Sequence, residues 1–231
     1  MLLPWVVVLT NAAAPGPPGP AAPPTGAAAA AVPTGETVDA TTLPAPHSFR
    51  RGLVVGLSLG AGLGGASGYP NDINRIGDPN YYSASGWMLG SSETLFVMGA
   101  LTDYLNVGFF LTQGVFRNGD WRSGGTAGGL RLETFPLALV YPRLAGLGAL
   151  AQFGIGGGNL TPAASGQGGA PAVDGTQSFA DVGVLYEWAF GHLFGGHFAA
   201  GPSLDYQAIW SQPFERHGLV AGARIAFYGG P

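Results

Sequence analysis

Apolar and polar residues alternate along most of the chain beyond residue 48, and the final segment shows this pattern most clearly. In residues 217–228 the even positions are mostly small, apart from Arg224 and a closing tyrosine. From residue 219 the odd positions are apolar, namely Leu219, Ala221, Ala223, Ile225 and Phe227. Successive strand side chains point to opposite faces, so the segment predicts a two-sided β-strand. A soluble sheet would bury the apolar face, whereas a membrane barrel would turn it to lipid.

Eight segments of this kind follow one another, separated by clusters of turn-forming residues. The expected strands lie at residues 49–61, 87–101, 104–112, 130–141, 147–156, 180–190, 198–210 and 217–228. Long and short connections alternate, with polar loops expected at 64–86, 117–126 and 159–175. An even number of strands joined by alternating short turns and long loops is typical of bacterial outer-membrane barrels.

The fourth expected strand is irregular. Its apolar face shifts from even to odd positions near Pro136, which predicts a β-bulge, because proline within sheets occupies edges and bulges. Beyond the bulge the outward-facing residues are expected to be Phe135, Leu137, Leu139 and Tyr141.

Composition also favours a barrel in a membrane. Only 10% of the residues are charged, against roughly 25% in soluble domains, and the mean hydropathy is +0.25. No uninterrupted apolar run approaches the ~20 residues that a transmembrane helix needs. We therefore expect an all-β chain that forms an eight-stranded antiparallel up-and-down transmembrane β-barrel. A soluble β-barrel or β-sandwich is the alternative architecture.

Aromatic residues lie at both ends of the expected strands, as in the two interfacial girdles of membrane barrels. The predicted girdle residues are Trp87, Tyr104, Phe116, Tyr141, Phe179, Trp188, Phe190, Phe198 and Trp210.

The chain before the first strand has a different composition. Residues 1–14 contain a short apolar core followed by small residues, which predicts a secretory signal peptide although the usual basic start is missing. Residues 15–47 are rich in alanine and proline, which predicts a disordered linker in the periplasm. Residues 48–231 are assigned to the barrel.

Charged residues on the inner strand faces are the main candidate functional set. They are Arg131, Glu133, Asp181, Glu187, Asp205 and Arg224. An eight-stranded barrel is just wide enough for side chains to fill it, and buried charges must be paired. We expect a lumen plugged by ion pairs. The alternative is a narrow polar conduit, in which four acids against two arginines would favour cations.

Other chemistry finds little support in the sequence. The chain has no cysteine, so disulfides and thiolate metal sites are excluded, and no metal site or cofactor is expected. The formal net charge of −4 gives no reason to expect nucleic-acid binding. No serine and acid can be placed beside any histidine from the sequence alone, so we do not expect an enzyme, although a lipid-modifying hydrolase remains an alternative.

Two short segments resemble the small eight-stranded outer-membrane proteins of the OmpA-like and OmpX-like type. They are residues 101–108, LTDYLNVG, and the ending at residues 222–227, GARIAF. The resemblance implies a location in outer-membrane lipid and insertion by the barrel-assembly machinery, which would read the final strand from Leu219 to Phe227. It also implies a structural or interaction role, with long loops exposed to an extracellular ligand, or a pore for ions or small solutes. Residues 228–231 follow Phe227, so the ending departs from the usual terminal aromatic.

Overall fold

The computed structural model describes residues 50–163 and 176–230. The expected signal peptide at 1–14 and the linker at 15–47 lie outside these residues. The strands are β1 (Gly52–Gly68), β2 (Ser83–Ala84), β3 (Met88–Thr102), β4 (Leu105–Arg117), β5 (Trp121–Thr134), β6 (Leu147–Pro162), β7 (Thr176–Tyr186), β8 (Trp188–Leu193), β9 (Gly196–Trp210) and β10 (Phe214–Gly229). Three 3-10 turns join them, η1 (Pro79–Tyr81), η2 (Pro136–Leu139) and η3 (Pro142–Leu144).

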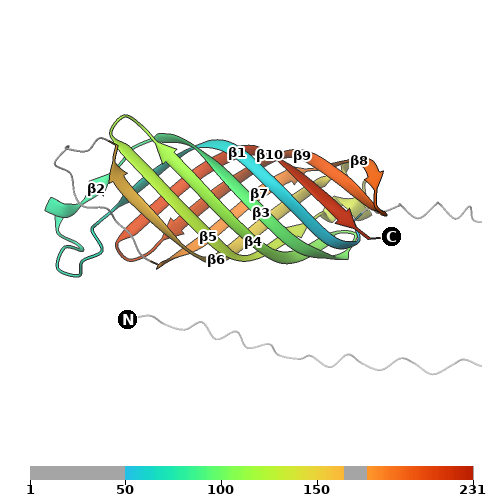
Figure 1. Ribbon diagram of the computed structural model, residues 1–231, viewed down its shortest axis with the longest axis horizontal. Helices are drawn as coiled ribbons and strands as arrows, with labels where there is room; N and C mark the ends of the chain where they lie inside the picture. The colour runs from blue at the N-terminus through green and yellow to red at the C-terminus, as the bar shows by residue number, and fades with distance from the viewer. Residues whose placement is uncertain (1–49, 164–175, 231) are drawn as a thin grey trace, which may run out of the picture. The chain divides into compact units, whose positions relative to one another are not determined.

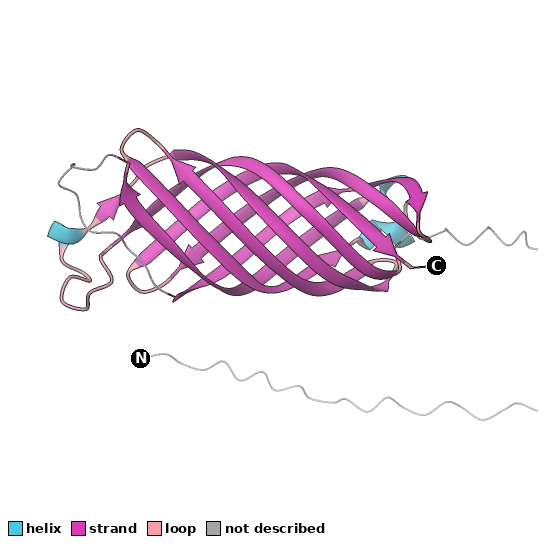
Figure 2. Cartoon of the chain, viewed as in Figure 1, coloured by secondary structure: helices cyan, strands magenta, loops and turns pink. Residues whose placement is uncertain are grey.

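The strands form one closed antiparallel ring (Figures 1 and 2). Their order is β10-β1-β3-β4-β5-β6-β7-β9, and β10 also pairs with β9. The short β2 lies beside β1. β7 and β8 both pair with β9 and together occupy one strand position in the ring, and we call each such strand position a stave. The ring therefore has eight staves, and the predicted eight-stranded antiparallel up-and-down barrel is confirmed. Within the described residues, no helix has the length and apolarity needed to cross a membrane.

The alternating pattern determines which side chains face outward. On β10, Leu219 and Ile225 are exposed, whereas Val220 and Arg224 are buried inside the barrel. The same rule holds on β4, where Leu111 faces outward and Phe110 inward. Large apolar side chains therefore cover the outer wall, and the core of the molecule is the filled lumen.

The barrel has two distinct ends. We call the end with residues 69–87, 118–120 and 211–213 the loop end, and the opposite end, where β1 begins and β10 finishes, the terminal end. The predicted strict alternation of long and short connections is wrong. Residues 118–120 form a short turn, and the longer connection 135–146 lies at the terminal end. The polar residues Arg122, Ser123 and Thr126 belong to β5 and pair with β4, so their polarity does not mark a loop.

The expected continuation of the fourth strand past Pro136 is also wrong. β5 ends at Thr134, and Pro136 and Pro142 each open a 3-10 turn. Proline has no amide hydrogen to donate to a strand partner, and its fixed φ suits the first position of a helical turn. Phe135 turns into the barrel and is fully buried, so it does not face outward as predicted.

Two of the nine predicted girdle residues are placed on the wrong face by the sequence analysis. Phe116 and Phe179 are 1% and 2% exposed and lie inside the lumen. Both share their strand face with inward residues, so alternation overrides their position near a strand end. The exposed members are Trp87, Tyr104, Tyr141, Trp188, Phe190 and Trp210. Phe198 is partly exposed, and its ring lies 5.0 Å from that of Phe227.

Candidate functional site in the barrel interior

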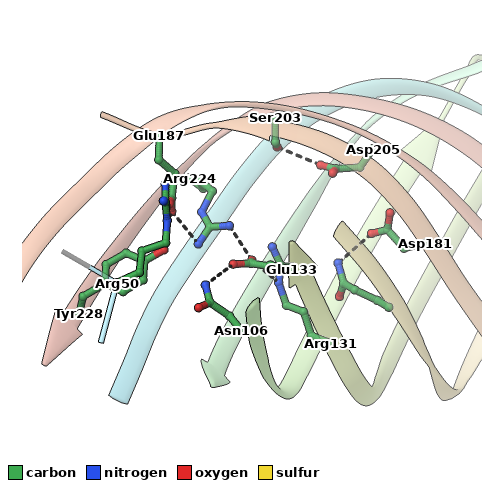
Figure 3. A network of polar contacts seen from close by, with 11 residues as sticks. Arg50, Asn106, Arg131, Glu133, Asp181, Glu187, Ser203, Asp205, Arg224 and Tyr228 are labelled. Carbon is green, nitrogen blue, oxygen red and sulfur yellow. Dashed lines mark hydrogen bonds and ion pairs between the residues drawn. The ribbon is translucent and has the colours of Figure 1, made fainter. Parts of the chain in front are cut away.

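Five charged side chains form a continuous chain of ion pairs near the terminal end (Figure 3). Arg131 Nε lies 2.8 Å from Glu133 Oε1, and Arg224 Nη1 lies 2.5 Å from the same oxygen. The second guanidinium nitrogen of Arg224 lies 2.9 Å from Glu187 Oε1. Arg50 Nε completes the chain at 3.3 Å from Glu187 Oε2. Each glutamate therefore bridges two arginines.

Neutral groups complete the coordination of these two carboxylates. Asn106 donates to Glu133 Oε2 at 3.2 Å, and the hydroxyl of Tyr228 donates to Glu187 Oε2 at 2.8 Å. The guanidinium groups of Arg131 and Arg224 lie 4.5 and 4.8 Å from the centre of the Phe96 ring. Such contacts favour a desolvated cation. The network therefore meets the requirement that buried charges be paired and hydrogen-bonded.

The bond between Arg224 and Glu133 crosses the bore. Arg224 belongs to β10 and Glu133 to β5, and these strands are four staves apart in either direction around the ring. The hydroxyl of Ser92 on β3 and the side-chain amide of Gln207 on β9 meet across the lumen at 3.1 Å. Further contacts join Phe110 to Phe179 and Arg216 to the carbonyl of Gly114. The lumen is thus filled at several levels.

Asp181 and Asp205 have a different environment. Asp181 accepts from Gln152 at 2.9 Å, and Asp205 accepts from Ser203 at 2.9 Å. No ion pair within 4.0 Å joins either aspartate to an arginine among residues 50–163 and 176–230. Asp181 is opposite Gln207 in the register, two positions from Asp205 on the same face. Two carboxylates are therefore close together with only neutral hydrogen-bond partners.

The structure places all six predicted lumen charges inside the barrel, together with two arginines that the sequence analysis missed. Arg50 and Arg216 are 3% and 4% exposed. Arg50 precedes β1 and Arg216 lies on β10. Both occupy even positions, like the inward residues Val54 on β1 and Arg224 on β10, so extending the alternation would have found them. In the described part of the chain the interior carries four arginines and four carboxylates, and the predicted excess of negative charge is absent.

A second polar cluster lies on the outer wall at the loop end. Tyr206 Oη and His217 Nδ1 are 2.7 Å apart, and Ser67 donates to Glu215 at 3.0 Å. These four residues line a hollow of about 400 Å³. A serine and an acid thus lie near a histidine, which the sequence analysis did not predict.

The bonds in this outer cluster do not form a nucleophile–base pair. The hydroxyl of Ser67 is bonded to the carboxylate of Glu215, and the ring of His217 is bonded to the hydroxyl of Tyr206. Residues 56–60 match G-x-S-x-G, but Ser58 lies within β1, whereas the nucleophile elbow requires a turn from strand to helix.

No family model matches the chain, and no curated protein matches it. Among solved structures, Ail, the attachment invasion locus protein of Yersinia pestis, in complex with the heparin analogue sucrose octasulfate, has 12% identity and a TM-score of 0.43, covering 76% of this chain and 99% of that chain. The N-terminal β-barrel domain of Pseudomonas aeruginosa OprF has 16% identity and a TM-score of 0.39, covering 77% and 97%. Neisserial surface protein A has 11% identity and a TM-score of 0.32, covering 74% and 94%.

Proposed function

We propose that this chain is a bacterial outer-membrane β-barrel protein with a structural or interaction role. The observation that carries the proposal is the inverted distribution of side chains. Leucine and valine side chains such as Val97, Leu111 and Leu219 face outward around the ring, while arginine, glutamate and aspartate side chains are buried inside it. A soluble barrel would do the reverse, whereas a lipid-facing wall requires this arrangement.

The filled lumen supports a structural or interaction role over a pore. The Arg224–Glu133 bond spans the bore, and aromatic and amide contacts fill it nearer the loop end. A conduit for ions would need a continuous polar path, and the pair Phe110 and Phe179 interrupts one.

Exposed chain at the loop end is the proposed contact surface for an extracellular partner. The segment 69–87 contains η1, and the rings of Tyr69 and Tyr82 pack against each other in a tilted arrangement with centroids 5.2 Å apart. Loops on a rigid scaffold commonly carry binding functions. In this arrangement the terminal end faces the periplasm together with the N-terminal linker, and the barrel-assembly machinery inserts the chain by reading β10.

The outer cluster of Ser67, Glu215 and His217 favours a second candidate, a lipid-modifying hydrolase on the barrel wall. Its observed hydrogen bonds argue against this activity, because a serine nucleophile needs its base within hydrogen-bond reach. A fluorophosphonate probe that labels the wild type but not Ser67→Ala would support the hydrolase. Equal absence of labelling in both proteins would remove it.

Membrane fractionation followed by gel migration of boiled and unboiled samples tests the main proposal. A folded membrane barrel is expected in the outer-membrane fraction and should migrate differently before and after boiling. Recovery in the soluble fraction without a heat-dependent shift would overturn it.

A further inference from the structure

Two arginines lie directly opposite each other on the outer wall at the loop end. Arg117 on β4 and Arg122 on β5 are register partners on either side of the turn 118–120, and both are exposed. Like charges directly opposite in a sheet repel and are destabilising. No carboxylate lies within 4.0 Å of either guanidinium in the residues that the structure describes, not even Asp120 of the same turn. Within residues 50–163 and 176–230 the pair therefore lacks a counter-charge.

A hollow adjoins this arginine pair. It has a volume of about 450 Å³, and its lining includes the side chains of Leu89, Ser91 and Val115 with both arginines. Trp87, one of the predicted girdle residues, lies two residues before Leu89 and is 78% exposed. Tryptophan is enriched where a membrane meets water. The arginines are thus placed near an interface, next to space for a headgroup.

The chemical type of the outward side chains changes along the wall from this hollow toward the terminal end. Along β4 the outward residues are Arg117, Val115, Gln113, Leu111 and Phe109. Glu93 on β3 accepts a hydrogen bond from Gln113 at 3.0 Å, and Thr126 on β5 is opposite Gln113. The wall therefore presents the two arginines first, then Val115, then amide, carboxylate and hydroxyl groups, and then the apolar side chains of Leu111 and Phe109.

A furrow runs along the same part of the wall. The outward residues of β5 between Arg122 and Leu130 are Gly124, Thr126 and Gly128, while the flanking strands carry Leu111 and Ile155. Two hollows of about 650 and 490 Å³ lie over this stretch and share the lining residues Leu95, Leu111 and Gly128. Because glycines on β5 lie between larger side chains on the two neighbouring strands, they leave a furrow on the outer surface.

We propose that the pair Arg117 and Arg122, the hollow beside it and the furrow over Gly128 together bind one phosphorylated glycolipid. A phosphate accepts hydrogen bonds from both Arg117 and Arg122, since guanidinium groups match phosphate geometry. Sugar hydroxyl and amide groups meet Ser91, Glu93 and Gln113, and an acyl chain lies in the furrow over Gly128. With Val115 as the exception, the groups on the wall follow the order of the lipid, from charged headgroup to hydrocarbon. This inference rests on the proposed outer-membrane location.

The test is lipid binding by the full-length protein in a phosphate-free neutral detergent, followed by native mass spectrometry. The probe is a diglucosamine lipid with two phosphates and six acyl chains. The wild type should retain one lipid, and Arg117→Gln/Arg122→Gln should bind it at least about tenfold more weakly. Arg51→Gln/Arg143→Gln, which removes two exposed arginines at the terminal end, is the matched control and should bind like the wild type. Equal affinity in both double variants would overturn the site.

Three further binding measurements distinguish the contribution of the headgroup from that of the acyl chain, and the binding of a lipid from the binding of a free anion. The dephosphorylated lipid should bind the wild type and the Arg117→Gln/Arg122→Gln variant equally, and weakly. Inorganic phosphate that binds as tightly as the glycolipid would overturn the lipid as the occupant. Gly128→Leu should weaken the glycolipid but not inorganic phosphate, because a Cβ at Gly128 meets only the flexible end of Leu111 within 3.0 Å. An unchanged lipid affinity in this variant would overturn the furrow.

The proposed membrane location and the proposed lipid site can be overturned independently of each other. Heat-dependent migration and fractionation are measured on the wild type and on each variant. A soluble wild-type protein would overturn the proposed function. If the barrel is in the outer membrane and its migration depends on heating, but replacing Arg117 and Arg122 leaves the lipid affinity unchanged, only this inference would be overturned.

Discussion

The guanidinium of Arg224 on β10 holds the carboxylate of Glu133 on the opposite wall of the barrel, with 2.5 Å between Nη1 and Oε1. The same side chain reaches Glu187 at 2.9 Å. One arginine thus connects three staves of the ring, and it neutralises two buried carboxylates.

Replacing this arginine tests its structural role. Arg224→Gln should lower the free energy of unfolding by about 3–5 kcal/mol, because it leaves buried carboxylates without a full complement of cations. Urea unfolding in detergent micelles, followed by tryptophan fluorescence, measures the change. Arg143→Gln, an exposed arginine, should leave the midpoint unchanged. The double variant Arg224→Gln/Glu187→Gln should recover part of the loss, and an unfolding midpoint of Arg224→Gln equal to that of the wild type would contradict the plug.

The aspartate pair should behave in the opposite way. Asp181→Asn should raise the free energy of unfolding, on the order of 1 kcal/mol, because it removes one of two neighbouring buried charges that lack an arginine partner. The same urea titration applies, with the exposed Asp120→Asn as control. A less stable Asp181→Asn protein would show that this charge is stabilised by its surroundings.

Aromatic residues inside and outside the barrel should differ in their contribution. Phe179 packs against Phe110 in the lumen with ring centroids 5.4 Å apart, and Phe179→Ala should cost about 3–5 kcal/mol. Trp87→Ala removes an exposed outer side chain and should change stability in detergent by less than about 1 kcal/mol. Unfolding of the two variants side by side checks the assignment, and equal losses would place Phe179 outside the core.

Planar-bilayer recording should show a closed lumen. The wild type is expected to give a stable baseline without conductance steps. Glu133→Ala/Arg224→Ala combined with Phe110→Ala/Phe179→Ala removes both the cross-bore ion pair and the aromatic pair that interrupts the polar path. This combined variant should produce steps in molecules whose unboiled gel migration shows a folded barrel. Regular steps from the wild type would mean that a polar path passes the ion-pair chain.

Much of the ring could be predicted from alternation alone. The two-residue period assigns Leu219 and Arg224 to opposite faces, and the same rule gives eight staves and an inner set of charges. The failures came where another signal was given priority over this period. Phe116 and Phe179 were assigned to girdles because of their position near strand ends, although alternation places them inside.

Contacts between distant strands could not be predicted, because they depend on register. Glu133 meets Arg224 only because β5 and β10 stand on opposite walls, and the sequence does not state how far each strand is shifted. Likewise, Arg117 and Arg122 become partners only when residues 118–120 form a short turn in place of the expected loop. The missing amide hydrogen of Pro136 was recognised, but a β-bulge and the first position of a 3-10 turn both tolerate a residue without this donor. The sequence alone therefore did not distinguish the two structures.

The closing position of β10 has a consequence for the order in which the barrel is completed. Among the described strands β10 comes last in sequence, it pairs with both β9 and β1, and it carries Arg216 and Arg224 into the interior. An intermediate without β10 has an open seam and lacks the cation that joins Glu133 to Glu187. Backbone closure and charge neutralisation therefore occur in the same step, and a chain truncated before β10 loses both together.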